Sequence, residues 1–264
     1  KNIKDYNKSL ENYNKQLNIS KEIGDKWMIS NSYSGIGLVY QKMGNFDKSI
    51  KNTKMSLDIK DSINDRNGHS NDLINIASTY LRMGDFDKAK NNLTTAYKAL
   101  EELKNDRSMH LVNLELGKVY FYEENYKDSI ESLNKSLSYF KEINDIAHYS
   151  ESLILLSQVY RISGSKEDSK RLLNEHSVDT PSYKLESKIE KLILNLNDKD
   201  SETKEIIKLA EGVNVPTDLK AYIYFNVGVI TDNSKHISKS KSLYESLYKK
   251  TKDFKYTYYL NQIK

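Results

Sequence analysis

The apolar and small residues of this chain recur with a fixed period of 40 residues. The pattern of residues 35–50, GIGLVYQKMGNFDKSI, returns at residues 75–90, 115–130 and 155–170 without insertion or deletion. Within each copy, apolar positions are spaced three or four residues apart, which is the spacing of one face of an α-helix. A fixed period in this range predicts a repeat solenoid in which every repeat packs on its neighbours.

Each period is predicted to hold two helices separated by a turn. The first helix is expected to be about 14 residues long and the second about 17, judged from the length of each periodic segment. The turn between them is placed at Gly44, Gly84, Glu124 and Gly164. The second helix is expected to end near Gly24, Asn64 and Asn144, because Gly and Asn tolerate the left-handed conformation that ends helices. Residues 1–23 match a second helix alone, so we expect the segment to begin inside a repeat.

The first helices carry a motif that resembles the tetratricopeptide repeat. A small residue is followed three positions later by Tyr in each copy, as the pairs Gly37/Tyr40, Ala77/Tyr80, Gly117/Tyr120 and Ser157/Tyr160. The resemblance implies an all-α fold, a right-handed superhelical solenoid of antiparallel helix pairs. The period is 40 rather than the usual 34 of the family, which resembles its extended class with longer second helices.

The register of the repeats loosens after residue 177. We predict a tetratricopeptide array over residues 1–177, made of a half repeat (1–25) and repeats at about 29–65, 69–105, 109–145 and 149–177. Residues 178–264 are predicted to form degenerate repeats of the same kind, the last one truncated. A separate helical domain over this region is the alternative.

Composition excludes several classes of function. The 41 basic and 37 acidic residues give a net charge of +4, and only five of the basic residues are Arg. Because Lys alternates with Asp and Glu over every predicted helix, direct contact with nucleic acid is not expected. The chain has no cysteine, which excludes disulfides, thiolate metal sites and thiol catalysis. No apolar run reaches the roughly 18 residues that a membrane span needs.

No catalytic or cofactor motif is present. The five histidines lack the spacing of a zinc site, and no glycine-rich phosphate loop or nucleophile elbow occurs. The carboxylates are interpreted as lying on polar, solvated helix faces. We therefore expect no enzyme activity, no cofactor and no metal.

The resemblance implies that the first helices line a concave groove that contacts a ligand. By spacing, this face has four columns of residues, one position from each repeat. The columns are Asn31, Asn71, Leu111 and Glu151; Ser34, Ile74, Leu114 and Ile154; Leu38, Ser78, Lys118 and Gln158; and Gln41, Leu81, Phe121 and Arg161. This mixed apolar and amide wall is suited to an extended peptide or a partner helix. The alternative is that curvature or the following repeat buries these residues.

These features predict a protein- or peptide-binding segment. It resembles the arrays that precede histidine-kinase or LuxR-type output modules in Bacteroidetes, which implies the sensor or interaction region of a larger bacterial regulator. In that case any membrane contact lies outside this segment, which is expected on the cytoplasmic or periplasmic side. A cytoplasmic peptide-pheromone receptor with Asn-rich inner helices, and a constitutive assembly scaffold without switching, are the two alternatives.

Overall fold

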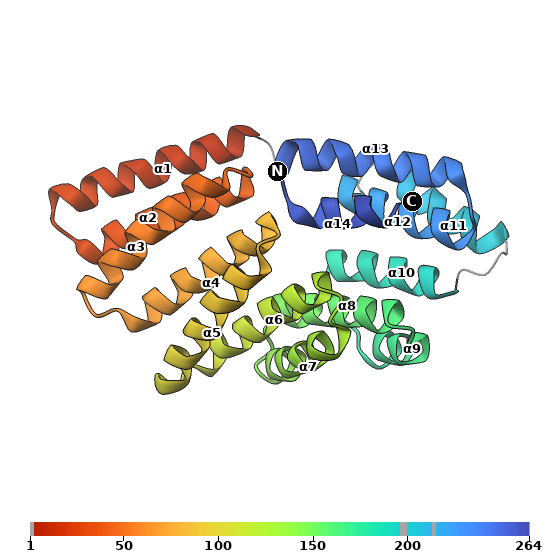
Figure 1. The fold of residues 1–264 in the computed structure, drawn as a ribbon, viewed down its shortest axis with the longest axis horizontal. Coiled ribbons are helices and arrows are strands. Elements are labelled where there is room, and N and C mark those ends of the chain that lie inside the picture. Colours follow the sequence, from red (N-terminus) through yellow and green to blue (C-terminus); the bar gives the residue numbers. More distant parts are fainter. Residues whose placement is uncertain (1–2, 196–199, 213–214, 264) are drawn as a thin grey trace. The chain divides into compact units, whose positions relative to one another are not determined.

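The computed structural model describes residues 3–195, 200–212 and 215–263, and the regular elements in these ranges are all α-helices (Figure 1). In chain order they are α1 (Ile3–Glu22), α2 (Lys26–Lys42), α3 (Phe46–Ser62), α4 (Arg66–Met83), α5 (Phe86–Glu102), α6 (Asp106–Tyr122), α7 (Tyr126–Glu142), α8 (Ile146–Ile162), α9 (Lys166–Glu175), α10 (Pro181–Asn195), α11 (Asp200–Glu211), α12 (Thr217–Ile230), α13 (Ser234–Thr251) and α14 (Phe254–Gln262). The all-α fold of helix pairs that the sequence predicted is confirmed.

From α2 to α8, a new helix begins every 20 residues. The first helices α2, α4, α6 and α8 are 17 or 18 residues long, so the predicted length of 14 was too short. The extra residues lie at the N-terminal ends. Asp25, Asp65 and Asp145 accept a hydrogen bond from the backbone N–H three residues later, and so start each helix directly after the preceding turn.

The turns follow the same spacing. Residues with positive φ stand at Gly44, Gly84, Glu124 and Gly164 between the two helices of a repeat, as the sequence predicted. A second series at Gly24, Asn64, Lys104 and Asn144 separates one repeat from the next. A left-handed residue every 20 positions therefore reverses the chain and keeps consecutive helices antiparallel.

Close packing within a repeat depends on the small residue of the motif. A Cβ added to Gly37 would lie 2.3 Å from Oγ1 of Thr53 and 3.1 Å from the carbonyl oxygen of Ser49. Gly37 therefore allows the backbones of α2 and α3 to approach. Ala77 and Ser157, at the same position of later repeats, are also buried, so the motif is a packing element.

Contacts divide the described chain into two compact units. The first contains residues up to 119 together with residues 250–254, and the second contains residues 120–249 and 255–263. In the first unit, Nε of Arg82 lies 2.7 Å from Oδ2 of Asp253, and the rings of Phe86 and Phe254 meet edge to face. The predicted boundary at residue 177 lies inside the second unit.

The repeat shortens within the second unit. Helix α9 has 10 residues where α3, α5 and α7 have 17. First helices begin 40 residues apart up to α8, but only 35 residues separate the starts of α8 and α10, at 146 and 181. That residues 178–264 are degenerate repeats stays a prediction. Residues 1–2, 196–199, 213–214 and 264 of the predicted ranges lie outside the described residues.

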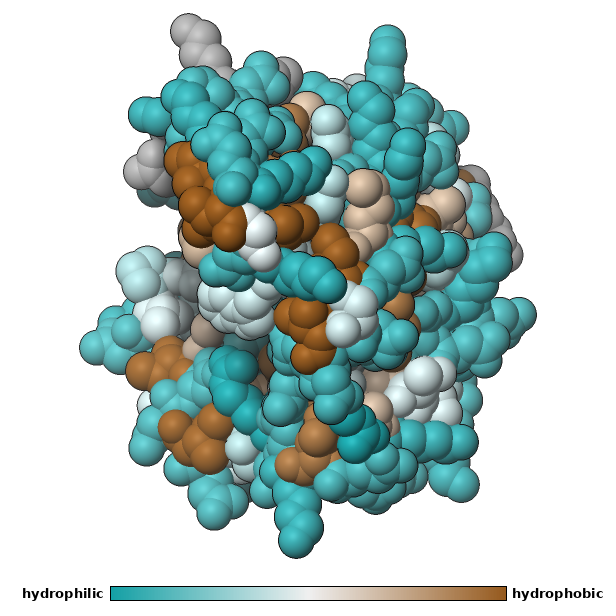
Figure 2. Space-filling model, turned by 90° about the vertical axis from the view of Figure 1, so that its left-hand side faces the viewer, coloured by the Kyte–Doolittle hydropathy of each residue, from teal (hydrophilic) through white to brown (hydrophobic). Residues whose placement is uncertain are grey.

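Hydrophilic side chains predominate on the face shown in Figure 2. On the face shown in Figure 2, apolar side chains form separate groups among hydrophilic ones. In the described part of the chain, no helix is both long enough and apolar enough to cross a membrane.

Candidate binding surface

The four columns of the first helices differ in exposure. The column of Asn31, Asn71, Leu111 and Glu151 is at least partly exposed in every repeat, and so is the column of Leu38, Ser78, Lys118 and Gln158. These two columns can meet a ligand without rearrangement of the helices. Ligand binding by any of these residues stays a prediction.

The column of Gln41, Leu81, Phe121 and Arg161 is a seam between helices. The first three residues are at most 8% exposed, and the Arg161 side chain is 10% exposed. Gln41 donates a hydrogen bond of 2.9 Å from Nε2 to Oγ1 of Thr79 on α4. In this structure these side chains hold neighbouring helices together, because burial leaves them no open face.

In the remaining column the exposure of the side chains decreases along the chain. Ser34 and Ile74 are partly exposed, whereas Leu114 and Ile154 are buried. Ser34 donates a hydrogen bond of 2.7 Å to Oδ1 of Asp72. The partly exposed surface is therefore broadest on α2 and α4, in the first unit.

A buried ion pair lies beneath this surface in the first unit. Nζ of Lys60 on α3 lies 3.0 Å from Oδ2 of Asp72 on α4, and the two side chains are 5% and 0% exposed. Oδ2 has no further partner among the described residues, so Lys60 alone compensates its charge. The interpretation that all carboxylates lie on solvated faces was therefore wrong for Asp72, and Glu190 is a second exception at 1% exposed.

Glu190 is the centre of a polar network in the second unit. Its carboxylate accepts hydrogen bonds of 3.1 Å from Nε2 of Gln158 and from Nε of Arg161, both on α8, and one of 2.5 Å from the Tyr222 hydroxyl on α12. Arg161 also donates 3.1 Å to Oδ1 of Asn226 and bonds the Tyr222 hydroxyl. Gln158 and Arg161 therefore join α8 to α10 and α12.

The charges in this network are mutually stabilised. Burial alone would lower the pKa of Arg161, but Tyr222 and Glu190 raise it above its ordinary value. Burial raises the pKa of Tyr222 well above its ordinary range. Arg161 is thus a cation, and Tyr222 is a neutral donor at physiological pH. With the Arg161 charge compensated inside the protein, the network contributes to helix packing.

The chemistry of the open columns is that of recognition. Their side chains are amides, a hydroxyl, apolar groups, the Glu151 carboxylate and the Lys118 ammonium, whose Nζ lies 2.6 Å from Oε1 of Glu115. Among the described residues, no group of three or more His, Asp or Glu side chains has the arrangement of a metal site. Amide side chains flanked by apolar ones can pair with peptide backbone groups while the apolar residues exclude water.

A comparison of the sequence with models of protein families identifies the family of the regular repeats. Residues 28–102, which form most of α2 together with α3, α4 and α5, match the family model of the tetratricopeptide repeat. Over these residues the sequence is that of tetratricopeptide repeats. The match covers two of the repeats that the 40-residue period predicts. The resemblance to Bacteroidetes regulators is not tested by this match. No curated protein sequence matches the chain.

Solved structures of this fold resemble nearly the whole chain at low sequence identity. The apo form of the quorum sensor NprR from B. thuringiensis is 14% identical with a TM-score of 0.70, over 93% of this chain and 71% of that one. A Rap protein complexed with competence and sporulation factor is 11% identical with a TM-score of 0.64, over 98% of this chain and 68% of that one. BtubC from P. vanneervenii is 12% identical with a TM-score of 0.59, over 92% of each chain. These likenesses concern the fold.

Proposed function

We propose that this protein binds a protein or peptide segment through the open columns of α2, α4 and α6. The observation that carries the proposal is the repeated exposure of one amide or apolar column, Asn31, Asn71 and Leu111, at 40-residue spacing in the first unit. Helices α2 and α4 add Leu38 and Ile74, both partly exposed. Asn can pair with both the N–H and C=O of an extended backbone, and the apolar neighbours can contact its side chains.

The finer proposal is that binding regulates a larger bacterial protein. A ligand that spans several first helices favours the arrangement of helices that it fits best, and so shifts the population of conformations. This role rests on the resemblance of the repeats to regulator input arrays. The fold likeness to NprR and the Rap protein supports the second candidate, a receptor of the peptide-pheromone type. A scaffold without switching is the third. We propose no enzyme activity.

A peptide selection tests the binding proposal. Peptides are selected from a random library on the purified chain, and the affinity of the strongest binder is measured for Asn31→Ala/Asn71→Ala. Loss of two amide contacts is expected to weaken binding roughly tenfold or more. Asn91→Ala/Asn134→Ala, on the exposed faces of the second helices α5 and α7, is the matched control. If the control weakens binding as much, or if neither pair does, the open columns are not the site.

A separate measurement tests whether peptide binding changes the conformation of helices that the peptide does not contact. Hydrogen exchange of the free and peptide-bound chain is compared for the second-helix backbones of α3 and α5, which the ligand does not touch. A regulator or receptor is expected to gain protection there. A scaffold is expected to gain protection only on α2, α4 and α6.

A further inference from the structure

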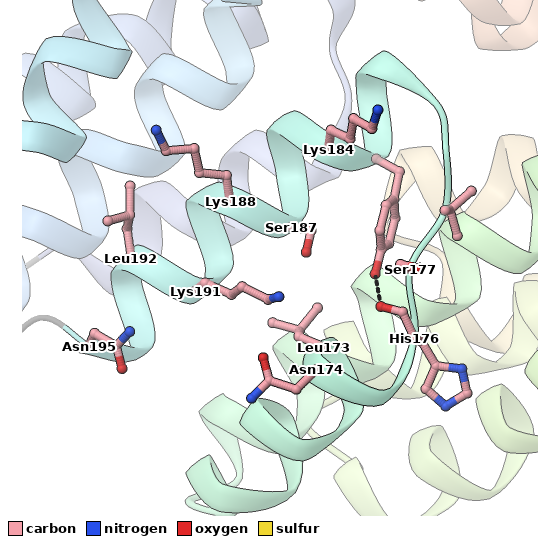
Figure 3. Close-up of a pocket in the computed structure, with 12 residues that line it drawn as sticks. Leu173, Asn174, His176, Ser177, Lys184, Ser187, Lys188, Lys191, Leu192 and Asn195 are labelled. Carbon is pink, nitrogen blue, oxygen red and sulfur yellow. Dashed lines mark hydrogen bonds between the residues drawn. The ribbon is translucent and has the colours of Figure 1, made fainter.

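A cleft lies where the second helix of the fourth repeat stops early. Helix α9 ends at Glu175, seven residues short of the length that α3, α5 and α7 share. Residues 176–180 continue without helical structure, and α10 begins at Pro181. The missing turns leave a cleft of about 400 Å³ between the end of α9, this linker and α10 (Figure 3).

The wall formed by the linker is held in place by hydrogen bonds. The Tyr183 hydroxyl on α10 donates 3.1 Å to the backbone carbonyl of His176, as drawn in Figure 3. The Tyr149 hydroxyl on α8 lies 2.6 Å from Nδ1 of His176. Val178 is buried beneath the linker. The cleft is therefore a built feature of the second unit.

The lining of the cleft is basic. It contains Lys184, Lys188 and Lys191 on α10 and no Asp or Glu, although the whole chain carries nearly equal numbers of acids and bases. Leu192 contributes partly exposed apolar surface, Leu173 and Val178 line the cleft as buried side chains, and Ser and Asn side chains contribute polar groups. This combination of cations, polar donors and apolar surface is complementary to an acidic, partly apolar ligand.

The three lysines differ in their partners. Lys184 pairs with Asp179 and Lys188 with Glu205, but these side chains are all more than half exposed, so the pairs are weak and can exchange. Lys191 has no ionic or hydrogen-bond partner among the described residues. In Figure 3 its side chain points across the cleft toward Leu173 and Asn174 at the end of α9, whereas those of Lys184 and Lys188 point away from the end of α9. Its ammonium group is placed to meet an anion that enters the cleft.

We propose that this cleft binds an acidic peptide segment. The lysines at positions i, i+4 and i+7 of α10 are spread over about 10 Å of helix, which exceeds the reach of a single phosphate group. Successive carboxylates along a peptide can span this distance, while an apolar side chain contacts the partly exposed Leu192. The site lies outside the four columns of the first helices, so it is separate from the surface of the proposed function.

Binding of a defined peptide tests the proposal. The probe is a short fluorescent peptide of Glu and Leu, with a peptide that has Gln in place of every Glu as its partner. Lys184→Gln/Lys188→Gln/Lys191→Gln is expected to bind the acidic peptide at least roughly tenfold more weakly than the unaltered chain. Lys48→Gln/Lys51→Gln/Lys54→Gln removes the same charge from the exposed face of α3 and is expected to leave affinity within about twofold.

The position of the bound peptide is checked with a single fluorescent label. Because the chain has no cysteine, Asn195→Cys can carry an environment-sensitive dye at the rim of the cleft, and its emission is expected to change when the acidic peptide binds. Equal loss in both lysine variants, equal binding of the Gln peptide, or a silent dye would overturn the proposal. Competition by inorganic phosphate at the same concentration as the peptide would also overturn it, since the site would then be one for free anions.

Discussion

The two junctions that contain buried charges are built differently. Between α3 and α4, Lys60 and Asp72 occupy positions whose equivalents 40 residues later are Leu100 and Val112, both fully buried. Between α8 and α10, Arg161 and Glu190 bond three further polar side chains, and the shortened repeat provides no apolar equivalent of Glu190. The Lys60–Asp72 pair takes the place of two apolar residues within a regular repeat. The Arg161–Glu190 pair is the centre of a network on which three helices depend.

The largest effect is expected from Glu190→Leu. The substitution removes three accepted hydrogen bonds and leaves the buried Arg161 cation uncompensated, so the free energy of unfolding should fall by about 3–5 kcal/mol. Hydrogen exchange followed by mass spectrometry should show lost protection in α8, α10 and α12. Helices α2–α5 should keep theirs, and equal loss there would mean that the network supports more than its own unit.

Removal of both the Arg161 and the Glu190 charge should not restore the stability that Glu190→Leu loses. In Arg161→Met/Glu190→Leu, the Tyr222 hydroxyl and Oδ1 of Asn226 remain buried without these partners, and each such group costs about 1–3 kcal/mol. The double variant is therefore expected to stay clearly less stable than the unaltered chain in urea unfolding. Recovery of full stability would remove the distinction between the two junctions.

The Lys60–Asp72 junction should behave in the opposite way. Lys60→Leu or Asp72→Val alone leaves a buried unpaired charge and is expected to cost about 3–5 kcal/mol. The double variant copies the Leu100 and Val112 positions of the next repeat, so it should lie close to the unaltered chain or be up to about 1–4 kcal/mol more stable. Urea unfolding of the four chains gives the coupling energy directly. A double variant as unstable as either single one would contradict the idea of a replaceable pair.

The regular helices could be predicted because the same residue pattern occurs in every repeat, so each repeat supports the assignment of the others. The turn residues Gly44, Gly84 and Gly164 and the packing residue Gly37 recur at one spacing, so a single period assigns many positions at once. The burial of the Lys60–Asp72 pair could also have been predicted from the sequence. Two opposite charges 12 residues apart stand where the next repeat has the apolar residues Leu100 and Val112, and this comparison would have indicated that they are buried together.

The shortened repeats could not be read in this way. Glu190 lies in a segment without an in-register copy, so its carboxylate resembles any other acid on an amphipathic helix. Its burial depends on Arg161 and Tyr222, which are distant in sequence and come together only after α10 packs against α8 and α12. The cleft has the same origin, because it results from turns that α9 lacks rather than from a motif.

The smallest effect concerns the end of the shortened helix. His176 stands 40 residues after Ser136, a buried residue inside α7, but here it ends the helix. Burial and then the nearby Lys141 lower the pKa of His176, against an opposing effect of Glu175. The folded chain therefore favours the neutral imidazole, whose Nδ1 lies 2.6 Å from the Tyr149 hydroxyl. Since the folded pKa lies below the unfolded value of about 6.5, this contribution to stability is present above that pH and is lost as the pH falls.

Titration of the imidazole by NMR checks this last point. The pKa of His176 should lie below 6.5, and Lys141→Gln should raise it toward that value because one of its two lowering causes is removed. The free energy of unfolding should decrease below pH 6.5, and by less in His176→Gln, which cannot titrate. If His176 titrates at or above 6.5, the linker is more open to water than the Tyr149 and Tyr183 bonds indicate, and the wall of the cleft is not held as we describe.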